Sequence, residues 1–205
     1  MMDFKNAKEL LELCESQSLP ISQVMKLREV EQSEISMETV ESRMAKALEI
    51  MRESATAPIH TPVKSMGGLI GGEARKLADH QEAGKGICGP VLGKGITYAM
   101  AVLETNASMG LIVAAPTAGS SGIVPGVLLA LQECYGYSDE AILKALFNAG
   151  AVGYLAMRNA TVAGAVGGCQ AEVGVAAAMA ASAAVELMGG SPRQCLDAAS
   201  IVLMN

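Results

Sequence analysis

The sequence has no tryptophan, and only six of its 205 residues are aromatic, four tyrosines and two phenylalanines. These are too few rings for the stacking platforms on which proteins bind single-stranded nucleic acid. Charged residues are also scarce, at 18%, and the net charge of −6 argues against a surface for nucleic acid or anionic lipid. Hydrophobic residues reach 51%, which excludes disorder as the main state of the chain.

Long apolar runs and secretion signals are missing as well. The best candidate for a membrane span, Val173–Val185, is too short and too rich in alanine. The N-terminus shows no signal peptide, and five cysteines, an odd number, do not fit a disulfide scaffold. We therefore expect a protein of the reducing cytoplasm that binds neither membrane nor nucleic acid.

Charge is unevenly distributed along the chain. The last 105 residues carry only ten of the 36 charged residues, so we expect that half to be buried by itself or by a partner. Residues 1–54 show amphipathic helical spacing, with Ser36 as a candidate N-cap. We predict one domain, in which helices of residues 1–54 pack on a helical core formed by residues 55–205.

The core region predicts helices joined by loops rich in glycine and proline. Gly93–Gly95 is expected to be a turn, and the apolar run Leu111–Ala115 also fits a buried strand. Expected helices span residues 73–81, 97–104 and 123–134, one begins after Ser138, and a small-residue helical tract covers residues 148–188.

The last helix has a clear start and no stop signal. Ser191 is a suitable N-cap, Pro192 fits the first helical position, and Gln194 completes a capping box. The end, Ile201–Asn205, is apolar and lacks a glycine or proline. We expect either that the chain is cut short of the natural protein or that a partner covers this end.

Two short loops combine hydroxyl groups with flexible backbone. Lys64–Gly68 reads Lys-Ser-Met-Gly-Gly, and Thr117–Gly122 reads Thr-Ala-Gly-Ser-Ser-Gly at the start of a predicted helix. Glycines allow close approach of the backbone, and helix N-termini attract anions, so a pocket for a carboxylate or phosphate is one interpretation. The other interpretation of Thr117–Gly122 is an ordinary turn that caps the start of a helix. Lys64 is also a conceivable Schiff-base lysine, although no phosphate cradle for pyridoxal phosphate lies nearby.

The cysteines offer one candidate for chemistry. Cys169 follows two glycines inside an apolar tract, which fits a nucleophile or metal ligand, or else a small buried hydrophobe. No pair of cysteines has the spacing of a self-contained metal site. Cys14 and Cys195 are predicted to lie in the core, Cys134 to be structural, and Cys88 is undecided.

Several long motifs resemble the alpha subunit of bacterial iron-sulfur-dependent L-serine dehydratase, and the resemblance covers essentially the whole chain. The resemblance rests on four stretches, in the order in which the family has them: Ser65–Gly68, Glu104–Gly110, Ala115–Gly126 and Asn159–Ala176. It implies an all-α catalytic domain, which overrides the strand option at Leu111–Ala115.

The resemblance also implies a cofactor, a 4Fe-4S cluster held by three cysteines, with one iron open to the substrate hydroxyl. Cys169 matches the first ligand, while the family's other two lie in a segment that these 205 residues do not contain. We therefore expect this chain to be inactive alone, as part of an enzyme that converts L-serine to pyruvate and ammonia. A beta subunit is the expected partner, and a homodimer is also possible.

The resemblance assigns roles to the residues of both loops. The substrate carboxylate is expected to be bound by Ser65, Met66, Gly67, Gly68, Thr117, Ala118, Gly119, Ser120 and Ser121, with a further hydrogen bond from Asn106. Lys64 and Ser65 are the candidates for the base that removes the α-proton. Two alternatives stay open: a binding or docking module without catalysis, and a pyridoxal-phosphate dehydratase that works through Lys64.

Overall fold

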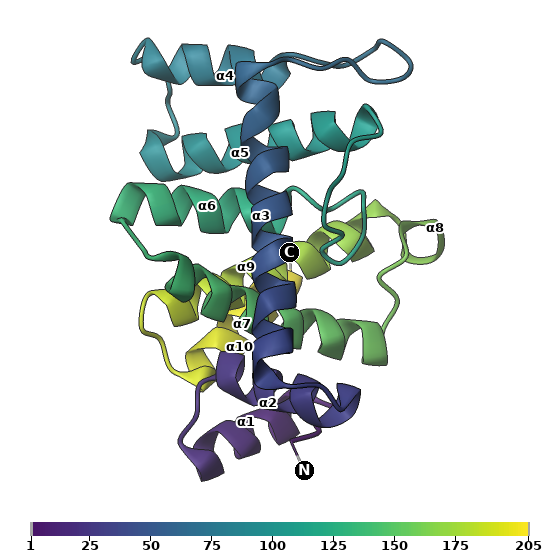
Figure 1. The fold of residues 1–205 in the computed structure, drawn as a ribbon, viewed down its shortest axis with the longest axis vertical. Coiled ribbons are helices and arrows are strands. Elements are labelled where there is room, and N and C mark those ends of the chain that lie inside the picture. The colour runs from purple at the N-terminus through teal and green to yellow at the C-terminus, as the bar shows by residue number, and fades with distance from the viewer. Residues whose placement is uncertain (1, 205) are drawn as a thin grey trace. The chain divides into compact units, whose positions relative to one another are not determined.

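The protein, described by a computed structural model over residues 2–204, is all-α, as expected, and contains no strand in that range (Figure 1). Leu111–Ala115 is irregular rather than a strand. The helices are α1 (Ala7–Gln17), α2 (Ile21–Ser33), α3 (Met37–His60), α4 (Glu73–Glu82), α5 (Gly89–Ala107), α6 (Ile123–Tyr135), α7 (Asp139–Asn159), α8 (Gly164–Gly167), α9 (Cys169–Leu187) and α10 (Pro192–Leu203).

The helices form two compact units. Unit 1 contains the residues up to Lys46 together with those from Ser138 onwards, and unit 2 contains Ala47–Tyr137. The boundary between them falls within α3, whereas the sequence placed a change of character further along the same helix, near residue 54. Unit 2 is thus a continuous segment, and unit 1 joins the N-terminal helices to the C-terminal ones.

Unit 1 is built around α9, which packs against α7 and α10, while α2 packs on α7 and α1 lies against α2 and α10. Alanine dominates the buried face of α9, and such small side chains let helix axes approach closely. One core cluster consists of Phe4, Leu10, Cys14, Ile21, Val24, Met25, Ala151 and Cys195. The prediction that Cys14 and Cys195 lie in the core is therefore confirmed.

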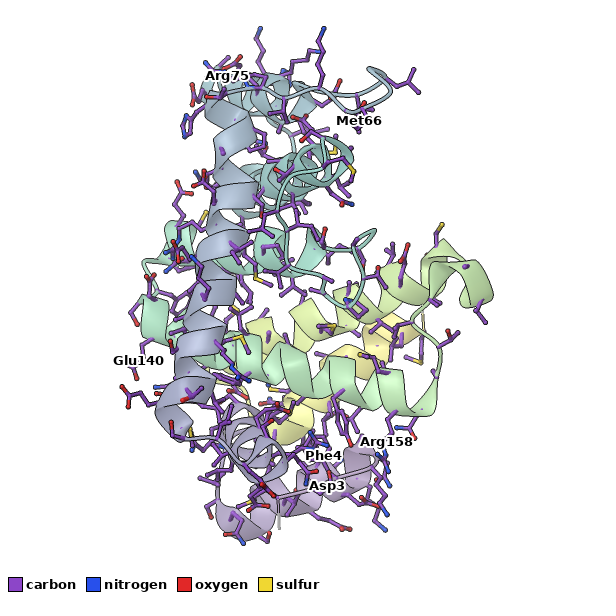
Figure 2. All side chains as sticks on the ribbon, turned by 45° about the vertical axis from the view of Figure 1, so that its right-hand side comes forward. Asp3, Phe4, Met66, Arg75, Glu140 and Arg158 are labelled. Carbon is purple, nitrogen blue, oxygen red and sulfur yellow. The ribbon has the colours of Figure 1, made fainter. Side chains whose placement is uncertain are left out.

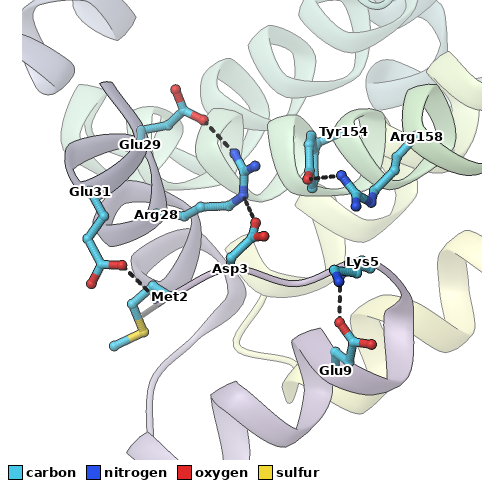
Figure 3. A network of polar contacts seen from close by, with 9 residues as sticks. All are labelled: Met2, Asp3, Lys5, Glu9, Arg28, Glu29, Glu31, Tyr154 and Arg158. Carbon is cyan, nitrogen blue, oxygen red and sulfur yellow. Dashed lines mark hydrogen bonds and ion pairs between the residues drawn. The ribbon is translucent and has the colours of Figure 1, made fainter. Parts of the chain in front are cut away.

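Within unit 1, a polar network holds the N-terminal segment against α2 and α7 (Figure 3). The Arg28 guanidinium donates to Asp3 at 3.0 Å and to Glu29 at 3.2 Å, and its central carbon lies 3.8 Å from the centre of the Tyr154 ring. Tyr154 also makes an edge contact with Phe4 at 5.4 Å between ring centres. The charged group thus covers an aromatic pair, which seals one side of the core from solvent.

Helix starts agree with the predicted caps. The side chains of Ser36, Ser138 and Ser191 accept hydrogen bonds from the backbone three residues further on. Gln194 returns a bond to the Ser191 N–H at 2.8 Å, which completes the predicted capping box. These local signals were sufficient because each cap involves only residues within one turn of the helix start.

Two predicted boundaries are wrong. Gly93–Gly95 lies inside α5 and is not a turn, because Gly93 leaves room for the amide of Gln81, which donates to the Gly93 carbonyl at 2.8 Å. The tract predicted as helical over residues 148–188 breaks after Asn159 and resumes at Cys169, with the four-residue α8 between. Gly168, at φ 80°, provides the turn before α9.

In unit 2, α5 lies between α4 and α6 (Figure 1). Glycine allows the close contact of α5 with α6, since a Cβ added at Gly126 would lie 2.8 Å from the Gly95 carbonyl oxygen. No helix within residues 2–204 is both long enough and apolar enough to span a membrane. Helix α5 is thus packed on two sides, by α4 and α6.

Candidate functional site

The last turn of α5, Glu104–Ala107, is the anchor of the candidate site in unit 2, and we call it the α5 terminal turn. Each of its four residues holds a different segment. The Glu104 carboxylate accepts from the Ala74 N–H at 2.9 Å, and the Thr105 hydroxyl donates to the Ser54 carbonyl at 3.0 Å. The other two residues bind the two loops singled out in the sequence.

Asn106 and Ala107 make these loop contacts. The Asn106 amide donates to the Ala118 carbonyl at 3.1 Å, and the Ala107 carbonyl accepts from the Met66 N–H at 3.1 Å. The structure therefore brings Lys64–Gly68, Asn106 and Thr117–Ser121 together, as the site prediction requires. Asn106 uses one of its two amide N–H groups to position a loop, which leaves the second N–H and the side-chain carbonyl oxygen for a ligand.

The helix ends sharply after the α5 terminal turn. The Gly110 N–H bonds back to the Thr105 carbonyl at 2.8 Å, and Met109 adopts φ 65° to allow it. A Cβ at Gly110 would lie 2.7 Å from the Thr105 Cγ2 atom. Gly110 is thus required by close approach, which explains its place in the motif Glu104–Gly110.

Loop A, which we define as Lys64–Gly72, is a closed hairpin-like loop. The Ser65 N–H donates to the Ile70 carbonyl at 2.9 Å, and the Ser65 hydroxyl accepts from the Ile70 N–H at 3.2 Å. Met66 lies near its outer end (Figure 2). Lys64 is exposed and forms no ion pair within the described residues, and Gly67 is exposed with open space around it.

Loop B, which we define as Thr117–Gly122, is held by its own hydroxyl groups. The Ser121 hydroxyl donates to the Ala118 carbonyl at 2.7 Å, and the Ser120 hydroxyl bonds the Ala115 carbonyl at 3.3 Å. Both serines are buried, whereas Ala118 and Gly119 are exposed. The serine side chains thus stabilise the loop, and its backbone at Ala118 and Gly119 is the part open to a ligand.

Glu104 is the residue of this site that the sequence analysis did not assign a role. Its side chain is 2% exposed, and one carboxylate oxygen, Oε2, has no hydrogen-bond partner among the described residues. A buried acid in a largely apolar helix was a visible signal in the sequence. Its partner could not be read there, because Ala74 lies 30 residues away.

Unit 2 also contains a cavity of about 580 Å³ beside α4 and α5, which the sequence did not predict. On its wall Glu133 accepts hydrogen bonds from Lys94, at 2.6 Å, and from the hydroxyl of Tyr98. Burial acts to raise the pKa of Glu133, but these two bonds hold it below its usual range. Burial, followed by the bond to Glu133, raises the pKa of Tyr98. Lys94, Tyr98 and Glu133 thus satisfy one another on this wall.

The five cysteines are free, and they differ in exposure. Cys169 is exposed at the first position of α9, in unit 1, and Cys88 is exposed just before α5. Burial raises the pKa of Cys14 to about 12 and of Cys195 to about 11, which suits inert core thiols. No three His, Cys, Asp or Glu residues within residues 2–204 group as metal ligands. The described residues therefore form no complete site for an iron-sulfur cluster, and the assignment of Cys169 as one ligand stays a prediction.

Fold and geometry together define an all-helical protein in which one helical turn anchors two loops of a candidate small-ligand site. The sequence model of the family "Serine dehydratase alpha chain" matches residues 16–205. The chain belongs to this family, as its motifs indicated.

Individual relatives agree with the family match. The "Probable L-serine dehydratase, alpha chain" of Bacillus subtilis (strain 168) is 43% identical over 202 residues, which are 98% of this chain and 67% of the relative. The "L-serine dehydratase, alpha chain" of Peptoniphilus asaccharolyticus is 38% identical over 97% of this chain and 68% of its own length. The "L-serine dehydratase" of Helicobacter pylori (strain ATCC 700392 / 26695) is 34% identical over 98% of this chain and 45% of its own length.

Proposed function

We propose that this chain is the substrate-binding part of an L-serine dehydratase alpha chain, a lyase that converts L-serine to pyruvate and ammonia. The observation that carries the proposal is the α5 terminal turn, which holds loop A through Met66 and loop B through Ala118. Two loops with exposed backbone donors, anchored on one rigid turn, suit a small substrate whose carboxylate needs a fixed orientation.

We assign the substrate carboxylate to the backbone of both loops. Within the described residues, no hydrogen bond occupies the N–H groups of Gly67 and Ala118, and both residues are exposed. The proposed set remains Ser65–Gly68, Asn106 and Thr117–Ser121. The hydroxyls of Ser120 and Ser121 bond backbone carbonyls at Ala115 and Ala118. We therefore expect these serines to support substrate binding by fixing the shape of loop B.

The proposed reaction is an elimination followed by a hydrolysis. A base takes the α-proton, the bond from Cβ to the hydroxyl oxygen breaks, and the hydroxyl leaves as water, which gives aminoacrylate. Aminoacrylate tautomerises to an imine, and one water molecule converts the imine to pyruvate and ammonia. Lys64 and Ser65 of loop A are the proposed candidates for the base, supported by their place beside the anchored segment.

We propose that Cys169 provides one ligand of a 4Fe-4S cluster and that the other ligands come from outside the described residues. Because no three-ligand group is present within residues 2–204, we expect these 205 residues alone to hold no complete cluster and to turn over no L-serine. We further propose pairing with a beta chain, self-association as a homodimer, and a cytoplasmic location, which the free cysteines support.

The test is anaerobic purification of the 205-residue chain, alone and with a beta chain, with the Bacillus subtilis relative as positive control. Iron, acid-labile sulfide, visible absorbance, pyruvate formation and L-serine binding are measured on each. We expect the control to carry iron and form pyruvate, and the 205-residue chain to bind L-serine over D-serine without turnover.

Three results would change the proposal. A complete cluster on the short chain would require ligands such as Cys88 that we have not assigned. An absorbance band near the violet edge, lost in Lys64→Ala, would favour a pyridoxal-phosphate enzyme. Binding of a beta chain without any L-serine binding would favour a docking module over a substrate-binding one.

A further inference from the structure

The buried carboxyl of Glu104 is the most unusual polar group in unit 2. The residue is 2% exposed, Oε1 has a single partner, the Ala74 N–H, and Oε2 has none within residues 2–204. Burying a carboxyl group with one oxygen unpaired is unfavourable, and a native protein retains such a group where the surrounding structure depends on it.

The bond to Ala74 fixes the start of α4. Ala74 is the second residue of that helix, and the N-cap residue Gly72 has no side chain with which to bond the free N–H groups. Glu104 therefore takes over the capping role from another helix. Because α4 directly follows loop A, this bond fixes the point at which the loop ends.

Two further contacts hold the same end of loop A. The Glu73 carboxylate accepts from the Gly71 N–H at 2.6 Å, and a Cβ at Gly71 would lie 2.8 Å from the Lys64 Cα, so the two strands of the loop meet there. Lys76 lies 3.9 Å from Glu73, and Arg75 pairs with Asp79 at 2.8 Å.

The opposite side of loop A is held by the same turn of α5. The Met66 N–H bonds the Ala107 carbonyl, which lies three residues beyond Glu104. Loop A is thus clamped between two points of the α5 terminal turn, one at its tip segment and one at its exit into α4. If either hydrogen bond is lost, loop A can move, and the exposed N–H of Gly67 no longer has a fixed position.

We propose that Glu104 is a positioning residue for substrate binding, which fixes loop A so that its backbone donors are in place for the L-serine carboxylate. The proposal rests on the function proposed above. Glu104 does not touch the substrate, and it acts through Ala74 and the exit of loop A.

The test compares Glu104→Ala with Glu104→Gln and with a matched control, Glu186→Ala. Glu186, in unit 1, also accepts from the second residue of a helix, Ser22 of α2. Hydrogen exchange of residues 64–72 is followed by mass spectrometry, and L-serine affinity by calorimetry, with KM and kcat where the assembled enzyme turns over.

We expect Glu104→Ala to raise exchange in loop A by about tenfold or more and to weaken L-serine binding by about tenfold to a hundredfold. KM should rise and kcat should fall together, because the candidate bases Lys64 and Ser65 lie on loop A. Glu104→Gln keeps an oxygen for Ala74 and should restore most of the affinity. Glu186→Ala should leave loop A exchange and affinity unchanged.

Unchanged exchange and affinity in Glu104→Ala would overturn the positioning role. If Glu104→Ala does not fold, Glu104→Leu takes its place and is compared with Glu104→Gln, since Leu fills the space without an acceptor. If the wild-type protein binds no L-serine, the proposed function fails. Loop A exchange in the variants then decides by itself whether Glu104 fixes the loop.

Discussion

The two units cap a helix in the same way but differ in what surrounds the cap. In each, a glutamate on one helix accepts a hydrogen bond from the second residue of another helix: Glu186 from Ser22 at 3.2 Å in unit 1, and Glu104 from Ala74 at 2.9 Å in unit 2. Neither α2 nor α4 has a side-chain cap of its own. A distant carboxylate thus replaces the local cap in both places.

The surroundings of the two glutamates differ. Glu186 also accepts from the buried amide of Asn148 at 2.7 Å, and Asn148 in turn accepts from the Ser182 hydroxyl at 2.6 Å. Glu104 has one bond and an unpaired oxygen. A network without an unpaired buried atom, which we call saturated, fixes a core, whereas an unpaired buried oxygen is typical of a functional region. Unit 1 therefore has the features of a scaffold and unit 2 those of a binding unit.

The largest expected effect tests the saturated network. Asn148→Ala removes both bonds of a fully buried amide, which leaves Ser182 without this partner and Glu186 with only the Ser22 N–H. We expect the free energy of unfolding to fall by about 2–4 kcal/mol, as measured by urea denaturation. Asn159→Ala, an exposed asparagine in the same helix, is the control, with an expected loss below about 1 kcal/mol. Equal losses would remove the distinction that we draw for unit 1.

A second substitution tests the clamp of unit 2. Gly71, at φ 147°, has no room for a Cβ beside Val63 and Lys64, whereas Gly67 has nothing within 4 Å. We expect Gly71→Ala to reduce the free energy of unfolding by about 1–3 kcal/mol and to disorder loop A, and Gly67→Ala to change it by less than about 0.5 kcal/mol. Thermal unfolding with hydrogen exchange checks both. A tolerated Gly71→Ala would mean that loop A is not tightly closed.

The pH dependence of stability tests the core thiols of unit 1. Burial raises the pKa of Cys14 from 9.0 to about 12 and of Cys195 from 9.0 to about 11, so the folded protein keeps protons that the unfolded chain loses. Their contribution is complete below pH 9 and is lost as the pH rises toward 11–12. We expect a loss of about 1 kcal/mol per thiol between pH 9 and pH 10.

The variant with Cys14→Ala and Cys195→Ala is the reference for this measurement. Its free energy of unfolding at pH 8, 9 and 10 should follow a shallower slope than that of the wild-type protein, because the remaining titrating groups are shared. Parallel slopes would show that the two thiols are not protonated differently in the folded and unfolded states.

Local signals in the sequence predicted much of this structure, and long-range contacts account for what was missed. The caps at Ser36 and Ser191, the all-α class and the core positions of Cys14 and Cys195 followed from residues near one another or from the motifs. The helical state of Gly93 did not, because it depends on Gln81 of another helix.

The candidate site shows the same limit. The motifs singled out both loops and Asn106, but periodicity and composition cannot show that one turn of α5 holds them. Glu104 was part of a quoted motif and was assigned no role, since its importance depends on burial and on a partner 30 residues away. The assignment of Cys169 to a cluster stays a prediction.

The smallest expected effect on stability concerns Cys169. Its substitution distinguishes the proposed cluster ligand from the core thiols of the same unit. The side chain is exposed at the start of α9, so Cys169→Ser should change the free energy of unfolding by less than about 0.5 kcal/mol. In the assembled enzyme the same change should abolish iron retention, because serine is a poor ligand for iron-sulfur clusters. Cys88→Ser, at the other exposed cysteine, is the control and should keep the iron. Iron retained in Cys169→Ser and lost in Cys88→Ser would move the proposed cluster ligand from unit 1 to unit 2, where the substrate loops lie.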